Sequence, residues 1–118
     1  MSQSVSDLMR PCRAAVQSTA TPAEAALAML SERVRELPVI DACGKLLGVV
    51  RAEDLFGIRE ETVKPAIRPV RLVVPADALP VDAVRMMQKV GSDQAVVVDG
   101  EKVVGLFAWQ DAVERLAD

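Results

Sequence analysis

The apolar positions of this chain follow one order of patterns, and that order occurs twice. In the first half, apolar residues recur at helical spacing between residues 22 and 34, which predicts a helix there. Thr21 is a favourable N-cap for it, and Pro22 suits the first helical position. Two short apolar runs follow, and the turn between them contains Gly44, as in a β-hairpin. A second helix is expected after the hairpin.

The second half repeats these patterns in the same order, with a helix that opens at Leu79-Pro80 and a hairpin that turns at Asp99-Gly100. A short strand is expected before each half. A charged stretch with two prolines is expected to connect the halves. In chain order, the expected elements are strand 14–17, helix 21–34, strands 37–41 and 46–50, helix 52–59, connector 59–69, strand 70–74, helix 79–90, strands 94–99 and 102–108, and helix 109–116.

The residues themselves also repeat. Proline, an acid, alanine, methionine, aspartate, glycine and aspartate return in the same order, mostly at an offset of 58 residues. The matching segments are residues 22–29 with 80–87, 39–41 with 97–99, and 48–54 with 105–111. The chain is therefore interpreted as two repeats, residues 1–60 with the N-terminal segment and residues 61–118.

The hairpin of each half is an almost continuous apolar strand pair, which has to be covered on both faces. One half is too short to cover its own sheet, because domains of about 50–60 residues bury little surface. We therefore expect an α+β fold in which two pseudo-symmetric β-α-β-β-α repeats pack as one module.

Composition narrows the classes of function. The 118 residues include no histidine and only two cysteines, Cys12 and Cys43, which excludes histidine-based catalytic dyads and His-ligated metal sites. A net charge of −3 and an aromatic content of 3% argue against a nucleic-acid partner. No apolar run reaches the length of a membrane span, and no signal-peptide pattern is seen. We expect a cytoplasmic protein that is not an enzyme, with no catalytic residue, no metal and no membrane partner.

The repeated pattern is a helix, Leu-Pro-Val-Ile-Asp, a glycine turn, Gly-Val-Val-x-x-x-Asp and a helix. It resembles a tandem pair of cystathionine-β-synthase (CBS) domains, often called a Bateman module, and residues 6–11 are similar to the usual entry of that family. The resemblance implies a regulatory module. Such pairs bind adenosine-containing ligands (AMP, ADP, ATP or S-adenosylmethionine) in clefts between the halves, form homodimers and act on a partner protein. No cofactor is required.

The resemblance also implies particular ligand-binding residues. The family's ribose-binding acid matches Asp54 in the first half and Asp111 in the second. One carboxylate can accept hydrogen bonds from both ribose hydroxyls. The alternative is that each acid only caps the first turn of its helix or adds a favourable charge to it.

This sequence departs from the family three residues before each acid, where a phosphate-binding Ser or Thr is usual. Arg51 stands there in the first half and Ala108 in the second. Arg51 is a candidate for a phosphate contact, or for a salt bridge to Glu53 instead. A position that is often basic in the family is occupied by Glu36, which would repel a phosphate.

An adenine ring needs an apolar slot. The candidates are Val16, Pro38 and Val39 in the first half, and Val73 and Val96 in the second. The alternative is that these residues belong to the hydrophobic core.

Two functions therefore stay open. One is a ligand-sensing module that binds an adenosine compound. The other is a ligand-free dimerisation or interaction module with degenerate nucleotide pockets. The helices that follow Gly48 and Gly105 carry Phe56 and Val113, and these apolar faces are expected to form the contact between subunits.

Overall fold

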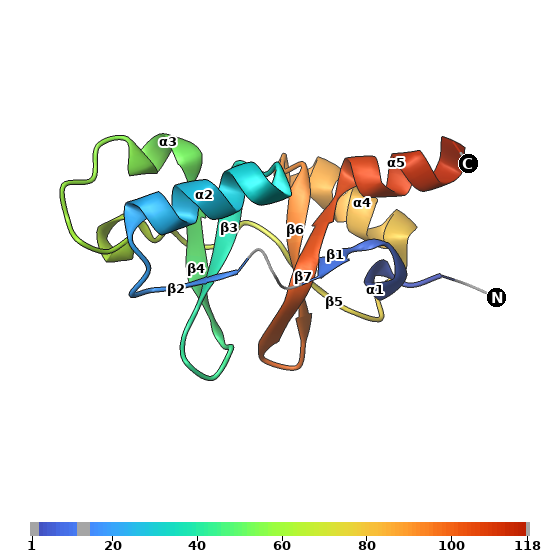
Figure 1. Cartoon of the computed structure of the whole chain (residues 1–118). Helices are drawn as coiled ribbons and strands as arrows, with labels where there is room; N and C mark the ends of the chain where they lie inside the picture. Colours follow the sequence, from blue (N-terminus) through green and yellow to red (C-terminus); the bar gives the residue numbers. More distant parts are fainter. Residues whose placement is uncertain (1–2, 12–14, 118) are drawn as a thin grey trace. The chain divides into compact units, whose positions relative to one another are not determined.

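The computed structural model describes residues 3–11 and 15–117 (Figure 1). Cys12 and Ala14, which figured in the sequence analysis, lie outside the described residues. The chain folds into two compact units, residues 14–70 and residues 1–13 with 71–118. We call them the Asp54 unit and the Asp111 unit, after the acid that each contains.

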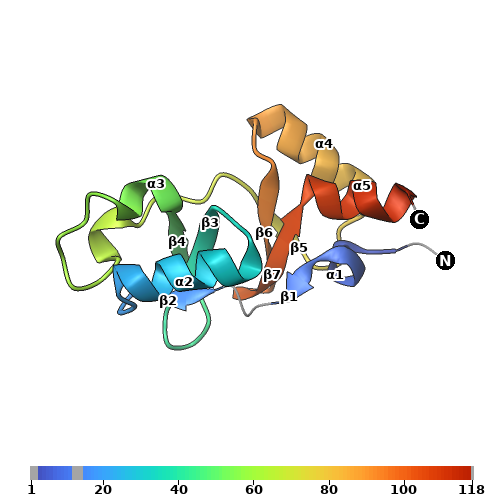
Figure 2. The ribbon, with the colours of Figure 1, turned by 45° about the horizontal axis from the view of Figure 1, so that its top comes forward.

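The Asp54 unit has a three-stranded sheet in the order β2-β3-β4 (Figures 1 and 2). Strand β2 is parallel to β3, and β3 and β4 form an antiparallel hairpin. Helices α2 and α3 contact each other, α2 contacts β3, and α3 contacts β4. The elements are β2 (Val16–Gln17), α2 (Pro22–Glu32), β3 (Glu36–Ile40), β4 (Leu46–Arg51), α3 (Ala52–Leu55) and the 3-10 helix η2 (Lys64–Ala66).

The Asp111 unit repeats this arrangement and adds one strand, so that its sheet runs in the order β1-β7-β6-β5. Strand β5 is parallel to β6, β6 and β7 form the hairpin, and β1 pairs antiparallel with β7. The elements are α1 (Val5–Leu8), β1 (Arg10–Pro11), β5 (Val73–Pro75), α4 (Pro80–Val90), β6 (Gln94–Asp99), β7 (Lys102–Ala108) and α5 (Trp109–Ala117). The predicted α+β class and its repeat are thus confirmed.

Some predicted elements are longer than the observed ones. Helix α2 ends at Glu32 because Arg33 takes a left-handed conformation with φ 56°. Helix α3 ends at Leu55, two residues before Gly57, a residue with low helix propensity. Strand β5 begins at Val73 and not at Val70 as predicted, because Val73 is the first residue of this stretch that pairs with β6, opposite Val96.

The buried residues of the two units correspond in pairs. Core residues of the Asp111 unit are Val5, Leu72, Val74, Ala83, Met87, Ala95, Val97 and Phe107. Those of the Asp54 unit include Val63, Ala25, Met29, Leu37, Val39 and Val50, each at the position that matches one of them. The two repeats therefore place apolar side chains at equivalent buried positions, although the sizes of these side chains differ, as between Val50 and Phe107.

Each unit contains a short entry segment, residues 5–11 in the Asp111 unit and residues 63–69 in the Asp54 unit. Each segment is tied to its unit in the same way. The N–H of Val5 donates to the carbonyl of Ala78 at 2.8 Å, and the N–H of Val63 donates to that of Ala20 at 3.0 Å. Both valines are fully buried.

The structure groups these segments differently from their order along the chain. The predicted boundary between residues 60 and 61 groups each entry segment with the repeat that follows it along the chain. In the structure, each segment belongs to the other compact unit, because its backbone pairs with the last strand there: Arg10 with Leu106, and Arg68 with Val49. Residues 59–69 are thus not merely a connector, since they contain part of the Asp54 unit.

Glycine makes this pairing possible. A Cβ atom on Gly48 would lie 2.5 Å from the carbonyl oxygen of Arg68. A Cβ atom on Gly105, the matching residue, would collide with the carbonyl oxygen of Arg10. The glycine of each hairpin therefore leaves the space that the entry segment occupies.

Candidate functional site

The two acids singled out from the sequence occupy the same place in the two units. Asp54 is the third residue of α3, directly after β4, and Asp111 is the third residue of α5, directly after β7. Each faces an arginine of the entry segment of its own unit. The repeat therefore includes an acid and a basic partner.

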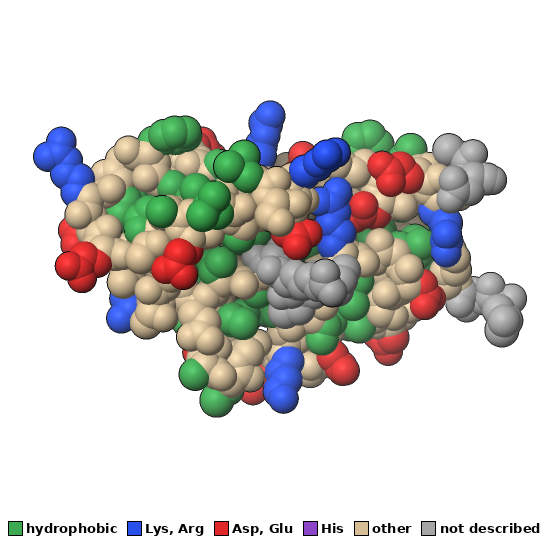
Figure 3. All heavy atoms as spheres, in the orientation of Figure 1, with side chains coloured by type: hydrophobic (Ala, Val, Ile, Leu, Met, Phe, Trp, Pro, Cys, Tyr) green, Lys and Arg blue, Asp and Glu red, His purple; other side chains and the backbone are tan. Residues whose placement is uncertain are grey.

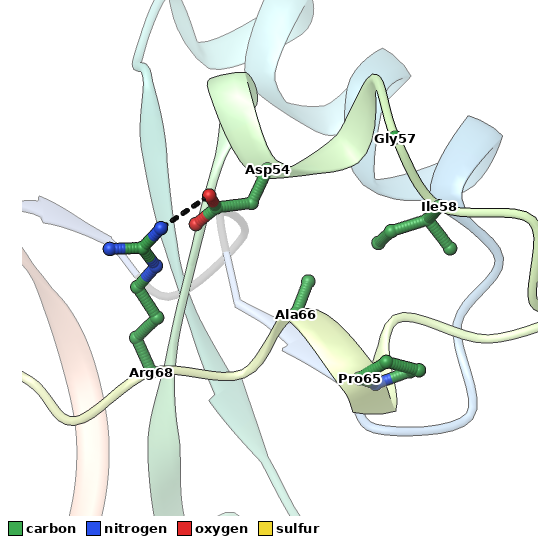
Figure 4. A pocket seen from close by; sticks show the side chains of 6 residues that line it. All are labelled: Asp54, Gly57, Ile58, Pro65, Ala66 and Arg68. Atoms are coloured by element: carbon green, nitrogen blue, oxygen red, sulfur yellow. Dashed lines mark hydrogen bonds and ion pairs between the residues drawn. The ribbon is translucent and has the colours of Figure 1, made fainter.

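The contact in the Asp54 unit is a short charged hydrogen bond. Nη2 of Arg68 donates to Oδ1 of Asp54 at 2.6 Å (Figure 4). The Asp54 side chain is 17% exposed and that of Arg68 is 49% exposed. Oδ2 of Asp54 is buried and has no hydrogen-bond partner among the described residues.

Arg68 is well positioned for this contact because its backbone is fixed. Its N–H donates to the carbonyl of Val49, and its carbonyl accepts from the N–H of Val49, both at 2.8 Å. The hydrogen bond to Asp54, followed by the charge of Asp54, raises the pKa of the Arg68 guanidinium above its usual value. Arg68 therefore keeps its positive charge under all ordinary conditions.

Asp111 has different partners. Its Oδ2 accepts from the backbone N–H of Ala108 at 2.9 Å, which caps the first turn of α5. Its Oδ1 lies 3.8 Å from Nε of Arg10, too far for a hydrogen bond. The side chains of Arg10 and Asp111 are 30% and 12% exposed. The capping role considered for these acids thus applies to Asp111, together with an ion pair.

The sequence indicated Arg68 as a residue at the edge of a cleft, either solvated or in contact with a phosphate, but it predicted neither the pairing of Arg68 with Asp54 nor that of Arg10 with Asp111. A signal was present in the sequence, because Arg10-Pro11 and Arg68-Pro69 are separated by the same 58 residues as the rest of the repeat. Only the folded units reveal that each arginine lies beside an acid.

Arg51 lies opposite Glu36 on the neighbouring strand, and its Nε is 4.0 Å from Oε2 of Glu36. This ion pair differs from the one expected with Glu53. Nε of Arg51 is buried and has no hydrogen-bond partner among the described residues. The negative charge of Glu36 offsets the positive charge that Arg51 would present to a phosphate.

The candidates for an adenine slot differ in exposure. Pro38, Val39 and Val96 are buried within their sheets, Val16 is half-buried, and Val73 is exposed. The ladder places Val16 opposite Val39, and Val73 opposite Val96. Val16 and Val73 are therefore the two candidates with surface left for a ligand.

A small open pocket of about 330 Å³ lies in the Asp54 unit between α3 and η2 (Figure 4). The ion pair of Asp54 and Arg68 stands at one end, and the other lining residues are Gly57, Ile58, Pro65 and Ala66. The sequence analysis did not predict these four residues, which come from two segments that meet only in the fold.

No group of three or more His, Cys, Asp or Glu side chains that could hold a metal ion occurs among residues 3–11 and 15–117. In that part of the chain, every helix is too short or too polar to cross a bilayer. Cys43 is a free, exposed thiol.

Comparison with known proteins gives a consistent result. The family model of the CBS domain matches the chain twice, at residues 5–61 and 63–118. No curated protein matches the chain.

Several solved structures are similar over nearly the whole chain. CBSX2 of Arabidopsis thaliana, in complex with AMP, is 25% identical, with a TM-score of 0.82 over 97% of this chain and 96% of that one. The CBS domain of a bacterial CNNM/CorC family Mg²⁺ transporter, in complex with ATP, is 22% identical, with a TM-score of 0.78 over 98% and 87%. The CBS domain pair of protein MJ0100, in complex with 5′-methylthioadenosine and S-adenosyl-L-methionine, is 21% identical, with a TM-score of 0.83 over 99% and 98%.

Proposed function

The chain belongs to the CBS domain family as a tandem pair, and from this premise we propose that it is a regulatory module that senses an adenosine-containing ligand. The ligand is AMP, ADP, ATP or S-adenosylmethionine, and its ribose hydroxyls bind to Asp54 or Asp111. The module carries out no reaction on the ligand. It transmits occupancy to a partner protein through rearrangement of a homodimer.

One observation carries the proposal: the fold puts an acid and a basic residue together at the same place in both units. A carboxylate suits two adjacent hydroxyls, and a guanidinium suits a phosphate. The complex of CBSX2 with AMP supports this ligand class, because that protein matches the chain over nearly its full length.

A thermal-shift screen with AMP, ADP, ATP and S-adenosylmethionine tests the proposal. A ligand present at a hundred times its dissociation constant adds about 2.7 kcal/mol to the free energy of unfolding, which raises the melting temperature by several degrees. The double variant Asp54→Asn, Asp111→Asn is expected to lose the shift. Glu53→Gln, which removes an exposed charge beside Asp54, is the matched control and is expected to keep it.

A shift that survives in the double variant would contradict the assignment of the two acids. If none of the four compounds shifts the wild-type chain, the sensing function is wrong. The second candidate, a ligand-free interaction module, would then take its place.

The homodimer is proposed on the exposed apolar surface of the Asp54 unit. Leu27 and Leu30 on α2 and Phe56 beside α3 are 66%, 76% and 92% exposed. Figure 3 shows apolar side chains gathered over α2 and α3. Large apolar side chains at such exposure are a feature of interfaces. Light scattering at high micromolar concentration is expected to give the mass of a dimer. Phe56→Glu is expected to lower the measured mass toward that of a monomer. A monomeric wild-type chain would refute this part.

A further inference from the structure

The carboxylate of Asp54 is not open to a ligand in the structure. Arg68 donates a hydrogen bond to Oδ1 at 2.6 Å. Oδ2 is buried. A ribose that binds this carboxylate through both of its hydroxyls therefore competes with the guanidinium of Arg68 for Oδ1 and has to displace it.

The guanidinium has room to move. It is half-exposed, so water screens its attraction to Asp54 and weakens the ion pair. The open pocket beside the pair, lined by Gly57, Ile58 and Ala66 among others, leaves space on one side of it (Figure 4). The hydrogen bond to Asp54 uses one of five N–H donors, so the others remain for a second anion.

Charge balance then decides which ligands can displace Arg68. Two neutral hydroxyls are weaker partners for a carboxylate than a guanidinium is, and an uncharged nucleoside leaves the displaced cation without an anion. A nucleoside phosphate replaces both halves of the ion pair, because its hydroxyls bind Asp54 and its phosphate binds Arg68. S-adenosylmethionine carries a sulfonium cation next to its ribose, and its one carboxylate is balanced by its own ammonium group, so it brings no net negative charge to Arg68.

We propose that Arg68 is the specificity-determining residue of the Asp54 site. It prevents uncharged and cationic adenosine compounds from binding to the carboxylate and allows anionic ones to bind. This inference rests on the proposed function and narrows its ligand class to adenosine phosphates. The ligand is selected when its two ribose hydroxyls replace the guanidinium at Asp54 and its phosphate binds that guanidinium.

The Asp111 unit offers an internal comparison. Nε of Arg10 lies 3.8 Å from Oδ1 of Asp111, and Oδ2 already accepts from Ala108. One partner of Asp111 is thus a backbone N–H, which needs no anion when a ligand binds, so we expect selection by charge to be weaker at Asp111 than at Asp54.

The test is calorimetric titration of the full chain with AMP, adenosine and S-adenosylmethionine. Asp111→Asn is introduced throughout to isolate the Asp54 site, and the asparagine oxygen can still accept from Ala108. We expect AMP to bind at least about tenfold more tightly than adenosine or S-adenosylmethionine.

Arg68→Ala is expected to weaken AMP binding about tenfold and to leave adenosine binding equal or tighter, so that the preference for AMP falls to about twofold or less. Arg68→Lys keeps a cation and is expected to keep part of the preference. Arg59→Ala removes an exposed arginine of the same unit and is expected to leave the preference unchanged.

Two failures are distinguishable. If the compounds bind but Arg68→Ala weakens AMP and adenosine by the same factor, Arg68 is only structural and the inference is wrong, while the proposed function stands. If no compound binds the Asp111→Asn chain, with or without Arg68→Ala, and none binds the wild-type chain titrated beside it, the proposed function fails and the inference fails with it. Binding by the wild-type chain alone would overturn only the inference. Should Arg68→Ala not fold, Arg68→Gln gives the same comparison with a side chain closer in length.

Discussion

The Asp54 unit and the Asp111 unit share one backbone arrangement but surround their acids differently. Asp54 makes a 2.6 Å charged hydrogen bond to Arg68, whereas Asp111 accepts from a backbone N–H and lies 3.8 Å from Arg10. The acid and the arginine occupy matching positions in both units, so the backbone repeat alone does not set the strength of the ion pair. The two units hold the matching carboxylate with different groups, a guanidinium in one and a backbone N–H in the other.

The position three residues before each acid illustrates the same point. Ala108 contributes only its backbone N–H, which Asp111 accepts. Arg51, its counterpart, has a large charged side chain that lies near Glu36 on β3. The Asp54 unit therefore has the ion pair of Arg51 and Glu36 at a position where the Asp111 unit has an alanine.

The largest expected difference concerns the two cores. Phe107 and Val50 hold matching buried positions in β7 and β4. Phe107→Ala is expected to lower the free energy of unfolding by about 3–5 kcal/mol, and Val50→Ala by about 2 kcal/mol, because the larger side chain leaves the larger cavity. Urea denaturation followed by circular dichroism measures both. Equal losses would show that the Asp111 core relaxes around the cavity.

Fluorescence sharpens this experiment, because Trp109, the single tryptophan of the chain, lies in α5 of the Asp111 unit. It reports the unfolding of that unit, whereas circular dichroism reports both units. Coincident transitions indicate that the units unfold together. In Phe107→Ala, a fluorescence transition at lower urea than the dichroism transition would show that they unfold separately.

The next effect concerns the glycines beneath the entry segments. Gly48→Ala and Gly105→Ala are each expected to lower the free energy of unfolding by about 2–3 kcal/mol, since the added Cβ meets a backbone carbonyl that cannot move without breaking strand pairing. Gly57→Ala is the control, because a Cβ there meets nothing within 4 Å. Chemical denaturation measures the three variants. If Gly48→Ala or Gly105→Ala is as mild as Gly57→Ala, the entry segment of that unit is not held as described.

A smaller effect is expected at the helix N-termini. Thr21 accepts from the N–H of Glu24, and Glu24 accepts from the N–H of Thr21, which completes a capping box on α2. Leu79, its counterpart on α4, provides no side-chain cap. Thr21→Ala is expected to destabilise the protein by about 1 kcal/mol, and Leu79→Thr to stabilise it by about 0.5–1 kcal/mol. Changes of opposite sign in the melting temperatures of the two variants would support the comparison, and a lower melting temperature for Leu79→Thr would contradict it.

The smallest effect is expected at the helix C-termini. Arg33 ends α2 in a left-handed conformation, and Gly91 ends α4 in the same one. Arg33→Gly is expected to raise the free energy of unfolding by about 0.5 kcal/mol, because glycine adopts this conformation without a Cβ clash. Gly91→Ala is expected to lower it by about 1 kcal/mol for the same reason. Melting temperatures of the two variants should move in opposite directions. A loss in Arg33→Gly would mean that the arginine side chain stabilises the turn more than its backbone strains it.

The sequence alone determined the repeat, the order of helices and strands, and the matching positions of Asp54 and Asp111. These features depend on local patterns, such as helical periodicity, apolar runs and turn residues, that can be read within a few residues. The ends of elements were predicted less well, as at Arg33 and Leu55, because a single residue conformation decides them.

Only the tertiary structure decided how each acid is paired and which unit each entry segment joins. Arg68 reaches Asp54 across 14 residues, and Arg10 lies near Asp111 from the opposite end of the chain. Likewise, Val73 is exposed and Val96 is buried although both are apolar strand residues that face each other across a ladder. Periodicity describes neighbours along the chain. Pairing and burial depend on segments that lie far apart in the sequence, as where Arg10 pairs with Leu106 and Arg68 with Val49.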